Sequence, residues 1–375
     1  MLPSHRVVRA SHCAVVVVTL GCARDTVAPE GPSGVALRAA PVHADEGPDP
    51  LDVGMATFED FALGAIHGQQ DWQSTGGVGS GAPSGSFCAV YDHAIADYAA
   101  VMPSGFRDAA FGQHSLRISN AVTTGCYSDQ TFSYRAADVA GELAASSRSR
   151  DGLTDFALAG AQLRNHLEIA WSIQSARPDA WQPGLELAAS PARGDEHRMS
   201  WVQVADWLDG LAVVFAERSD PAAPARFVQT VVARGLDRQR AHAIRLSLDF
   251  VDGPANDVVR VYVDGVLRHT GTSWETYYNL DANGRSNFGG ATPAVNRVMF
   301  RTGSDRHRGV PGDPAPETLG HGFLIDGVSV VAFSLATSAA SCRDSGWRDL
   351  RDDAGRSFRN QGDCVSWVQR ARDDR

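Results

Sequence analysis

Carboxylates are the side chains of this sequence with the widest range of chemistry, and their spacing limits what they can do. Retaining cleavage of a glycosidic bond needs two carboxyl groups about 5 Å apart, one as the nucleophile and one as the acid. A Glu-x-Asp-x-x-Glu strand would present such groups, but in HLEIAWSIQ Glu168 is followed by Ala170 and Ile173. In SWVQVAD, Gln203 is followed by Ala205, where the Gln-x-His pair of a polysaccharide lyase needs His. Both stretches therefore lack the residues that these reactions require.

The other acidic residues are scattered among predicted strands and loops. Each is more typical of loop charge or of hydrogen bonding in turns than of catalysis, although two of them could meet in space. The sequence also contains no Gly-x-Ser-x-Gly elbow, His-Glu-x-x-His helix or phosphate-binding loop. The absence of paired carboxylates and of these motifs favours a binding protein over an enzyme. The scattered acidic residues are Asp92, Asp129, Asp195, Glu196, Asp206 and Glu275.

Aromatic residues next to polar ones are the better candidates for a ligand site. Sugar rings have apolar faces that pack on aromatic rings, while their hydroxyls need polar partners. TSWETYYN and DAWQPG combine both kinds of side chain. For Trp274, packing in the core is the alternative to ligand contact, and the sequence leaves it open. The predicted ligand-binding residues are Trp274, Tyr277, Glu275, Asn279, Trp181 and Gln182.

The strand and hairpin NDVVRVYVDGVLRHTG precedes the first of these stretches. Val259, Val261 and Val263 alternate with polar residues, which predicts a strand with one buried face. Asp264 and Gly265 supply the two left-handed backbone positions of a tight hairpin. The polar side of this strand and the loop that follows could form a platform for a glycan.

Similar alternating stretches recur from about residue 51 to residue 335, with turn residues between them. This spacing predicts an all-β sandwich of two sheets. We expect an export signal over residues 1–22, a flexible tether over 23–52, the sandwich over 53–335 and a small C-terminal element over 336–375. The stretches are HSLRISNAV, HLEIAWSIQ, RMSWVQV, GLAVVFAE, RFVQTVVA, AIRLSLDFV, RVYVDGV, VNRVMFRT and GFLIDGVSVVAFS.

The N-terminus has the layout of an export signal. Arg6 and Arg9 precede a short apolar run that ends at Leu20, and no run is long enough to span a membrane. Leu20-Gly21-Cys22 resembles a bacterial lipobox, in which Cys22 would carry the lipid; the alternative is a plain cleaved signal. The only membrane contact expected is this lipid anchor. With the anchor we expect a protein of the cell envelope, and with a plain cleaved signal we expect an extracellular protein.

The cysteines fit an oxidising compartment. Without Cys13 in the signal and Cys22 on lipid, four cysteines remain, which permits three pairings. Pairing within each local segment is favoured, which joins Cys88 to Cys126 and Cys342 to Cys364. The second pair would close a C-terminal element that has too few apolar residues to form a core without a covalent cross-link.

The net charge of −10, from 44 acidic and 34 basic residues, argues against nucleic acid as a partner. A chain of this charge repels phosphate backbones. We expect a glycan or another extracellular polymer instead.

Five stretches resemble exported bacterial proteins with a concanavalin A-like lectin/glucanase jelly-roll domain, over about residues 54 to 333. The end of the chain is similar to a short cysteine-bounded element of other exported bacterial proteins. The resemblance implies a jelly roll, and with the residues above it favours an exported, surface-anchored, non-catalytic binding module. A polysaccharide hydrolase or lyase and a purely structural envelope protein are the alternatives. The stretches are TFEDFALGAIHGQQDW, SLRISNAVTTGCYSDQTFS, QPGLELAASPARGDEHRMSWVQV, LDFVDGPANDVVRVYVDGVLRHTGTSWE and GFLIDGVSV.

A structural calcium is a further implication of this resemblance. Many jelly-roll carbohydrate-binding modules clamp their first and last strands with calcium, and TFEDF and FLIDGVSV resemble those strands. Glu59, Asp60 and Asp326 could supply oxygen ligands, with backbone carbonyls completing the six to eight that calcium takes. The alternative is a turn capped by Asp326 before Gly327.

Overall fold

A computed structural model describes eleven stretches of the chain: residues 55–74, 92–119, 130–143, 161–193, 198–218, 227–253, 255–275, 277, 294–302, 320–353 and 355–373. The chain divides into a unit of residues 1–46 and a unit of residues 47–375, and every described residue belongs to the second. The predicted export signal and tether lie outside the described residues, as do Cys22, Cys88, Cys126 and Asn279.

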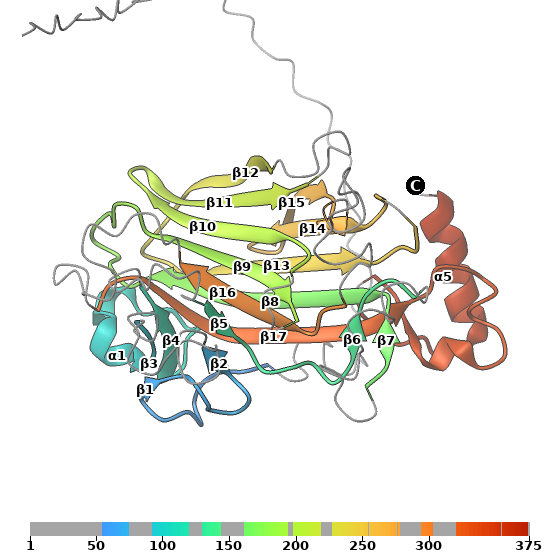
Figure 1. Cartoon of the computed structure of the whole chain (residues 1–375), viewed down its shortest axis with the longest axis horizontal. Coiled ribbons are helices and arrows are strands. Elements are labelled where there is room, and N and C mark those ends of the chain that lie inside the picture. The colour runs from blue at the N-terminus through green and yellow to red at the C-terminus, as the bar shows by residue number, and fades with distance from the viewer. Residues whose placement is uncertain are drawn as a thin grey trace, which may run out of the picture. The chain divides into compact units, whose positions relative to one another are not determined.

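Two large sheets of antiparallel strands dominate the described part of the chain (Figure 1). The first, called the β8 sheet here, has the order β1-β3-β4-β17-β8-β13-β14-β15, with β18 pairing in parallel with β17. Its strands are β1 (Gly64–Ala65), β3 (His93–Asp97), β4 (His114–Ile118), β17 (Phe323–Leu335), β8 (His166–Ser175), β13 (His242–Asp249), β14 (Val258–Val263), β15 (Val266–Gly271) and β18 (Leu350–Arg351).

The second sheet, called the β11 sheet here, has the order β12-β11-β10-β9-β16-β5-β2. A separate parallel pair joins β6 (Val139–Ala140) to β7 (Leu163–Arg164). The strands of the β11 sheet are β12 (Val228–Leu236), β11 (Gly210–Glu217), β10 (Trp201–Trp207), β9 (Glu186–Ala192), β16 (Arg297–Thr302), β5 (Gln130–Phe132) and β2 (Gln73–Ser74).

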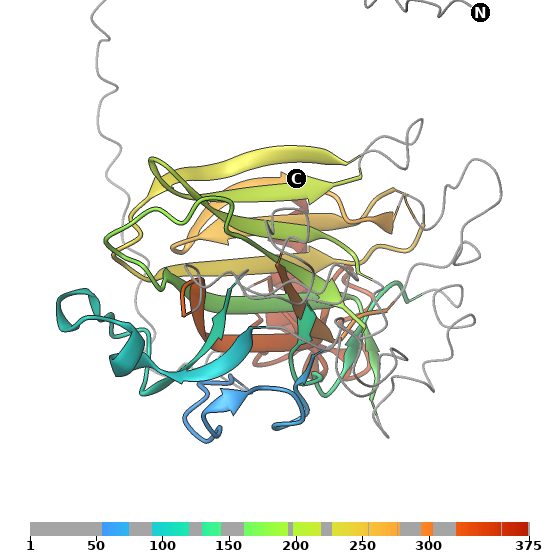
Figure 2. The ribbon, with the colours of Figure 1, turned by 60° about the vertical axis from the view of Figure 1, so that its left-hand side comes forward.

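The two sheets share one hydrophobic core. Trp171 of β8 packs edge-on against Phe300 of β16, with ring centroids 5.8 Å apart, so the sheets face each other. The inward side chains of β8 and β14 alternate with polar ones, as in Ile169 and Val261, which are both fully buried. The all-β jelly-roll sandwich expected from the sequence is thus confirmed. Figure 2 shows the same layers turned, with α1 (Tyr98–Val101) beside the β3–β4 end of the β8 sheet.

Each of the nine alternating stretches contains a strand, and the predicted hairpin is present between β14 and β15. Asp264 and Gly265 have φ angles of 52° and 74°, so both adopt the left-handed conformation that a two-residue hairpin turn needs. Because the turn fixes the register, Arg260 and Tyr262 point away from the core while Val259, Val261 and Val263 point into it.

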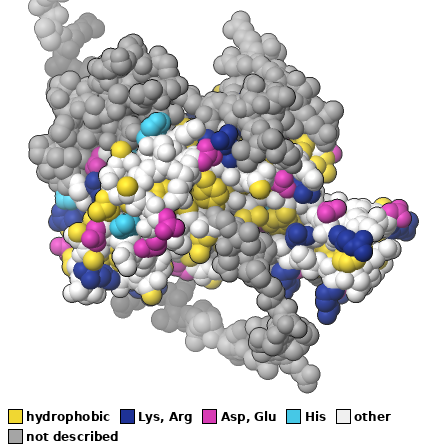
Figure 3. Space-filling model, turned by 90° about the horizontal axis from the view of Figure 1, so that it is seen from below, with side chains coloured by type: hydrophobic (Ala, Val, Ile, Leu, Met, Phe, Trp, Pro, Cys, Tyr) yellow, Lys and Arg dark blue, Asp and Glu magenta, His cyan; other side chains and the backbone are white. Residues whose placement is uncertain are grey.

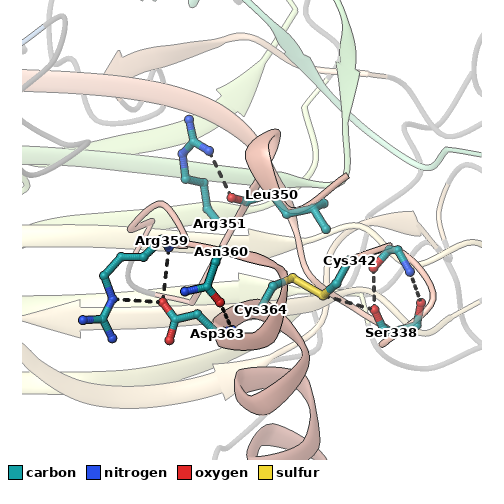
Figure 4. Close-up of a disulfide and its surroundings, with 9 residues drawn as sticks. Ser338, Cys342, Leu350, Arg351, Arg359, Asn360, Asp363 and Cys364 are labelled. Carbon is teal, nitrogen blue, oxygen red and sulfur yellow. Dashed lines mark hydrogen bonds and ion pairs between the residues drawn. A yellow bond between two sulfur atoms is a disulfide. The ribbon is translucent and has the colours of Figure 1, made fainter. Parts of the chain in front are cut away.

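The C-terminal element has a disulfide and a hydrophobic cluster of its own. Cys342 is bonded to Cys364, as predicted, and Cys364 lies in the first turn of α5 (Gln361–Asp373) (Figure 4). Asn360 caps this helix by accepting a hydrogen bond from the backbone N–H of Asp363 at 2.9 Å. The cluster comprises Ala336, Cys342, Leu350, Phe358, Cys364 and Val368, with Trp347, Val365 and Trp367 packed against it.

Neither α5 nor any other helix in the described ranges is long and apolar enough to cross a bilayer. Acidic and basic side chains lie next to each other on the described surface when the molecule is seen from below (Figure 3).

Candidate ligand-binding face

The outer face of the β8 sheet carries a group of five interacting charged side chains. On β8, Leu167 and Ile169 point into the core, so His166 and Glu168 point the other way. The register places His166 opposite Asp249 and Glu168 opposite Ser247 on β13. The polar residues of three neighbouring strands therefore meet on one side of the sheet.

Five side chains form an unbroken chain of alternating charge across these strands. The Nε2 of His166 lies 2.9 Å from Glu168 Oε1, and its Nδ1 lies 2.7 Å from Asp249 Oδ1. Arg245 donates through NH1 to Glu168 Oε2 at 3.3 Å. Arg260 donates through NH1 to Asp249 Oδ2 at 2.8 Å. Each carboxylate thus binds the histidine with one oxygen and an arginine with the other.

The two carboxylates require His166 to be the doubly protonated imidazolium, because both ring nitrogens must donate. Burial opposes this charge, but the hydrogen bonds and negative charges of Asp249 and Glu168 outweigh burial and raise the pKa of His166 to about 9. Burial also opposes ionisation of Asp249, yet the bond to His166 and the nearby cations lower its pKa. His166 and Asp249 are therefore held in their charged forms at neutral pH.

Arg245 and Arg260, the first and last of these five charged side chains, reach the surface. The side chain of Arg245 is 28% exposed and that of Arg260 is 27% exposed, whereas Glu168 is only 4% exposed. The guanidinium carbon of Arg245 lies 3.6 Å from the ring centroid of Tyr262, its opposite neighbour on β14. The face therefore presents a half-buried tyrosine beside two arginines, and each arginine is bonded to a more deeply buried carboxylate. We call Arg245, Tyr262 and Arg260 the arginine–tyrosine face.

Trp274, the centre of the glycan platform predicted from the sequence, lies in the core instead. It is 2% exposed, its Nε1 donates to the carbonyl of Ala216 at 3.0 Å, and its ring centroid is 4.9 Å from that of Phe227. A buried indole offers no face to a sugar, so the alternative of core packing is correct and Trp274 is not retained as a stacking residue.

Of the neighbours of Trp274 that the structure describes, Glu275 is buried and Tyr277 is half-buried. The Oε2 of Glu275 accepts hydrogen bonds from the backbone N–H groups of Asn256 and Asp257 at 2.9 and 3.4 Å. Burial raises the pKa of this carboxyl. Tyr277 is half-buried, with the guanidinium carbon of Arg218 3.9 Å from its ring centroid. The predicted platform is therefore not assembled by these residues.

The second predicted pair divides into an exposed and a buried residue. Trp181 is 44% exposed and donates through Nε1 to the carbonyl of Asp206 at 2.9 Å. Gln182 is buried, and its amide binds both backbone groups of Gly322 and the hydroxyl of Ser175. Since these bonds engage both ends of the amide, Gln182 ties its loop to the start of β17 rather than facing a ligand.

Two of the three predicted calcium ligands accept hydrogen bonds from the backbone at the start of β4. Glu59 Oε1 accepts from the backbone N–H groups of Gln113 and His114, and Asp326 Oδ2 accepts from that of Gly112 at 3.1 Å. Asp60 is exposed. Burial, with a smaller contribution from Glu59, raises the pKa of Asp326 to about 7. Across the described residues, no group of three or more acidic, histidine or cysteine side chains could hold a metal ion.

A hollow of about 570 Å³ lies beside α1, but its polar groups serve the local fold. The hydroxyl of Tyr98 donates to Gln174 and accepts from the backbone N–H of Asp108, both at 2.8 Å. Arg107 donates to two backbone carbonyls of the same segment. We therefore place the candidate site on the arginine–tyrosine face.

The sequence matches no described protein family and no curated protein. Several solved structures are similar to part of it. An endo-β-1,4-glucuronan lyase from Trichoderma reesei is 10% identical, with a TM-score of 0.32, over 64% of this chain and 87% of that one. An endo-1,3-β-glucanase from Streptomyces sioyaensis is 15% identical, with a TM-score of 0.26, over 44% and 63%. The CBM40 of Ruminococcus gnavus IT-sialidase, bound to α2,3-sialyllactose, is 16% identical, with a TM-score of 0.23, over 45% and 76%. At these scores none of them assigns a site or an activity to this chain.

Proposed function

We propose that this chain is an exported module that binds glycans without cleaving them, and that its arginine–tyrosine face is the binding surface. The observation that carries the proposal is a pair of arginines, each bonded to a buried carboxylate, beside a half-buried tyrosine on the outer side of the β8 sheet. Ligand sites of this kind combine an aromatic surface with a few oriented polar groups. The buried carboxylates of Glu168 and Asp249 hold the two guanidinium groups in position, so a ligand does not have to order them on binding.

The protonation state of His166 supports binding rather than catalysis at this face. A general base works best when its pKa lies near the operating pH, and it must be able to accept a proton. With a pKa of about 9 and both ring nitrogens bonded to carboxylates, His166 has no acceptor site at neutral pH. Glu168 and Asp249 are likewise engaged through both oxygens.

Affinity electrophoresis of the full chain through gels that contain different polysaccharides tests this proposal. We expect retardation by at least one polysaccharide, and we expect Tyr262→Ala to weaken it by about 1 to 3 kcal/mol. Trp207→Ala is the matched control, because Trp207 is a half-buried aromatic residue on β10, in the other sheet, that also lies beside an arginine, Arg234. Equal loss in both variants would contradict the assignment of the face. Steady release of sugar products by the wild-type chain would instead establish an enzyme.

A surface anchor through Cys22 is part of the same proposal, since Leu20-Gly21-Cys22 follows an apolar run. Lipid chains contribute about 0.8 kcal/mol per buried CH₂ to membrane affinity, so a multiply acylated cysteine would hold the module at the envelope. Mass spectrometry of the mature N-terminus is expected to find an acylated Cys22. An unmodified terminus at another residue would reduce the proposal to plain secretion.

We also propose that calcium binds beside Glu59 and Asp326. Both carboxylates already accept backbone N–H groups, and Asp60 does not join them in a group of three, so the cation would use the remaining lone pairs of Glu59 and Asp326 together with backbone carbonyl oxygens. The raised pKa of Asp326 reflects burial and the nearby charge of Glu59, and a cation would relieve both. Removing calcium with a chelator should then lower the melting temperature. If the temperature stays the same and no metal co-purifies, the site is absent.

A further inference from the structure

We infer that the arginine–tyrosine face selects glycans that carry carboxylate or sulfate groups over neutral ones. The inference rests on the proposed function and names the ligand class of the same site. Three of the five side chains in the charged chain are cations and two are anions, so the group carries one net positive charge at neutral pH. This surplus stands on a protein whose net charge is −10.

The positive charge is displayed at the surface while the negative charge is kept below it. All four carboxylate oxygens of Glu168 and Asp249 are bonded to cations of the same group. Those two side chains are 4% and 12% exposed, and the two arginines are more than twice as exposed. An approaching ligand therefore meets guanidinium groups first.

Each guanidinium keeps donors for a ligand. The hydrogen bonds described for Arg245 and Arg260 use NH1 alone, so Nε and NH2 remain in the described part of the structure. The planar arrangement of these donors matches the oxygens of a carboxylate or sulfate, which neutral hydroxyls do not reproduce.

The register brings the two arginines within reach of one stretch of polymer. Arg245 lies opposite Tyr262, and Arg260 is two residues before Tyr262 on the same strand. Arg245 and Arg260 are therefore diagonal neighbours on antiparallel strands, and the backbones of such neighbours are about 7 to 8 Å apart. Adjacent acidic units of a polysaccharide could thus bind both guanidinium groups, while one of their rings packs beside Tyr262.

Three forms of one polymer test the inference without changing the sugar backbone: hydroxyethyl cellulose, carboxymethyl cellulose and cellulose sulfate. We expect the full wild-type chain to bind one or both charged forms at least about tenfold more tightly than the neutral form, because hydrogen bonds to a charged group are stronger than those to a neutral hydroxyl. Added salt should reduce the difference. Comparing carboxymethyl cellulose with cellulose sulfate shows whether the face prefers carboxylate or sulfate groups.

Variants then locate the binding. Arg245→Gln and Arg260→Gln are each expected to weaken binding to the charged polymer about tenfold, with little effect on binding to the neutral one. Arg234→Gln is the matched control, because Arg234 is a 62% exposed arginine on β12 that also pairs with an aspartate. Arg245→Lys keeps the charge but not the planar donors, so we expect a partial loss. Circular dichroism and melting curves check that the variants fold, and the polymer comparison with wild type needs no variant.

Each result decides between the inference and the proposed function. Equal binding to the neutral and charged polymers overturns the inference and leaves a glycan-binding module. Binding to none of the wider set of polysaccharides overturns both. Equal binding to duplex DNA at the same salt concentration would mean that the face attracts any polyanion, which also overturns the inference.

Discussion

Replacing Trp274 with alanine is expected to lower the free energy of unfolding by about 3 to 5 kcal/mol, the cost of removing a large aromatic side chain from a core. The indole is 2% exposed and packs among Phe227, Trp201 and the guanidinium of Arg198. Its Nε1 also donates to the carbonyl of Ala216, which the variant would leave without this partner. Urea unfolding followed by circular dichroism measures the change.

Trp181→Ala is the control for this measurement. Trp181 is 44% exposed, so its removal should cost about 1 kcal/mol, mainly through the hydrogen bond to Asp206. Similar unfolding curves for the two variants would show that Trp274 is not a core residue. A weaker affinity for glycans with unchanged stability in Trp274→Ala would restore the platform that the sequence suggested.

The sequence was sufficient to predict the sandwich because the relevant signals are local. Alternation such as that of Val259, Val261 and Val263 repeats every two residues, and a buried strand face needs nothing else to be recognised. Asp264-Gly265 fixes its hairpin by backbone conformation alone. The pairing of Cys342 with Cys364 followed from their proximity along the chain.

Strand β9 shows where this local signal fails. Its residues, ELAASPA, include three alanines and a proline, and alanine and proline are both depleted in strands. The segment is nevertheless paired on both sides, with β10 and β16. Tertiary pairing overrides its weak propensity, and a reading of alternation could not have found it.

The candidate face was only partly predictable, because its residues meet through strand pairing. Arg260 and Tyr262 belong to the polar side of the strand that alternation predicts, and Glu168 lies in HLEIAWSIQ, the stretch that lacks the glycosidase pattern. His166 and Asp249 are 83 residues apart, and their contact depends on the register of β8 with β13. A search for alternating polar residues on both strands could have indicated that each has a polar face, although not which residues pair.

The charge on His166 makes the stability of the sandwich depend on pH between about pH 6.5 and pH 9. Its pKa is about 9 in the folded chain against an ordinary value of 6.5, so the folded state holds the proton more tightly. The stabilisation is fully present below the unfolded value and is lost as the pH rises through the folded value. Two to three pKa units at 1.36 kcal/mol each correspond to roughly 3 kcal/mol.

We therefore expect the free energy of unfolding of the wild-type chain to fall by roughly 3 kcal/mol more than that of His166→Gln between pH 6.5 and pH 9. Gln cannot carry the charge, so the variant should be much less stable than wild type below this range, where Glu168 and Asp249 lose the cation between them. The difference should shrink above it. Asp257 and Asp326, whose pKa values are raised to about 7, titrate in both proteins and cancel in the comparison. Denaturant unfolding across the pH range gives the measurement, and parallel curves for the two proteins would show that His166 is not a cation bound between two carboxylates.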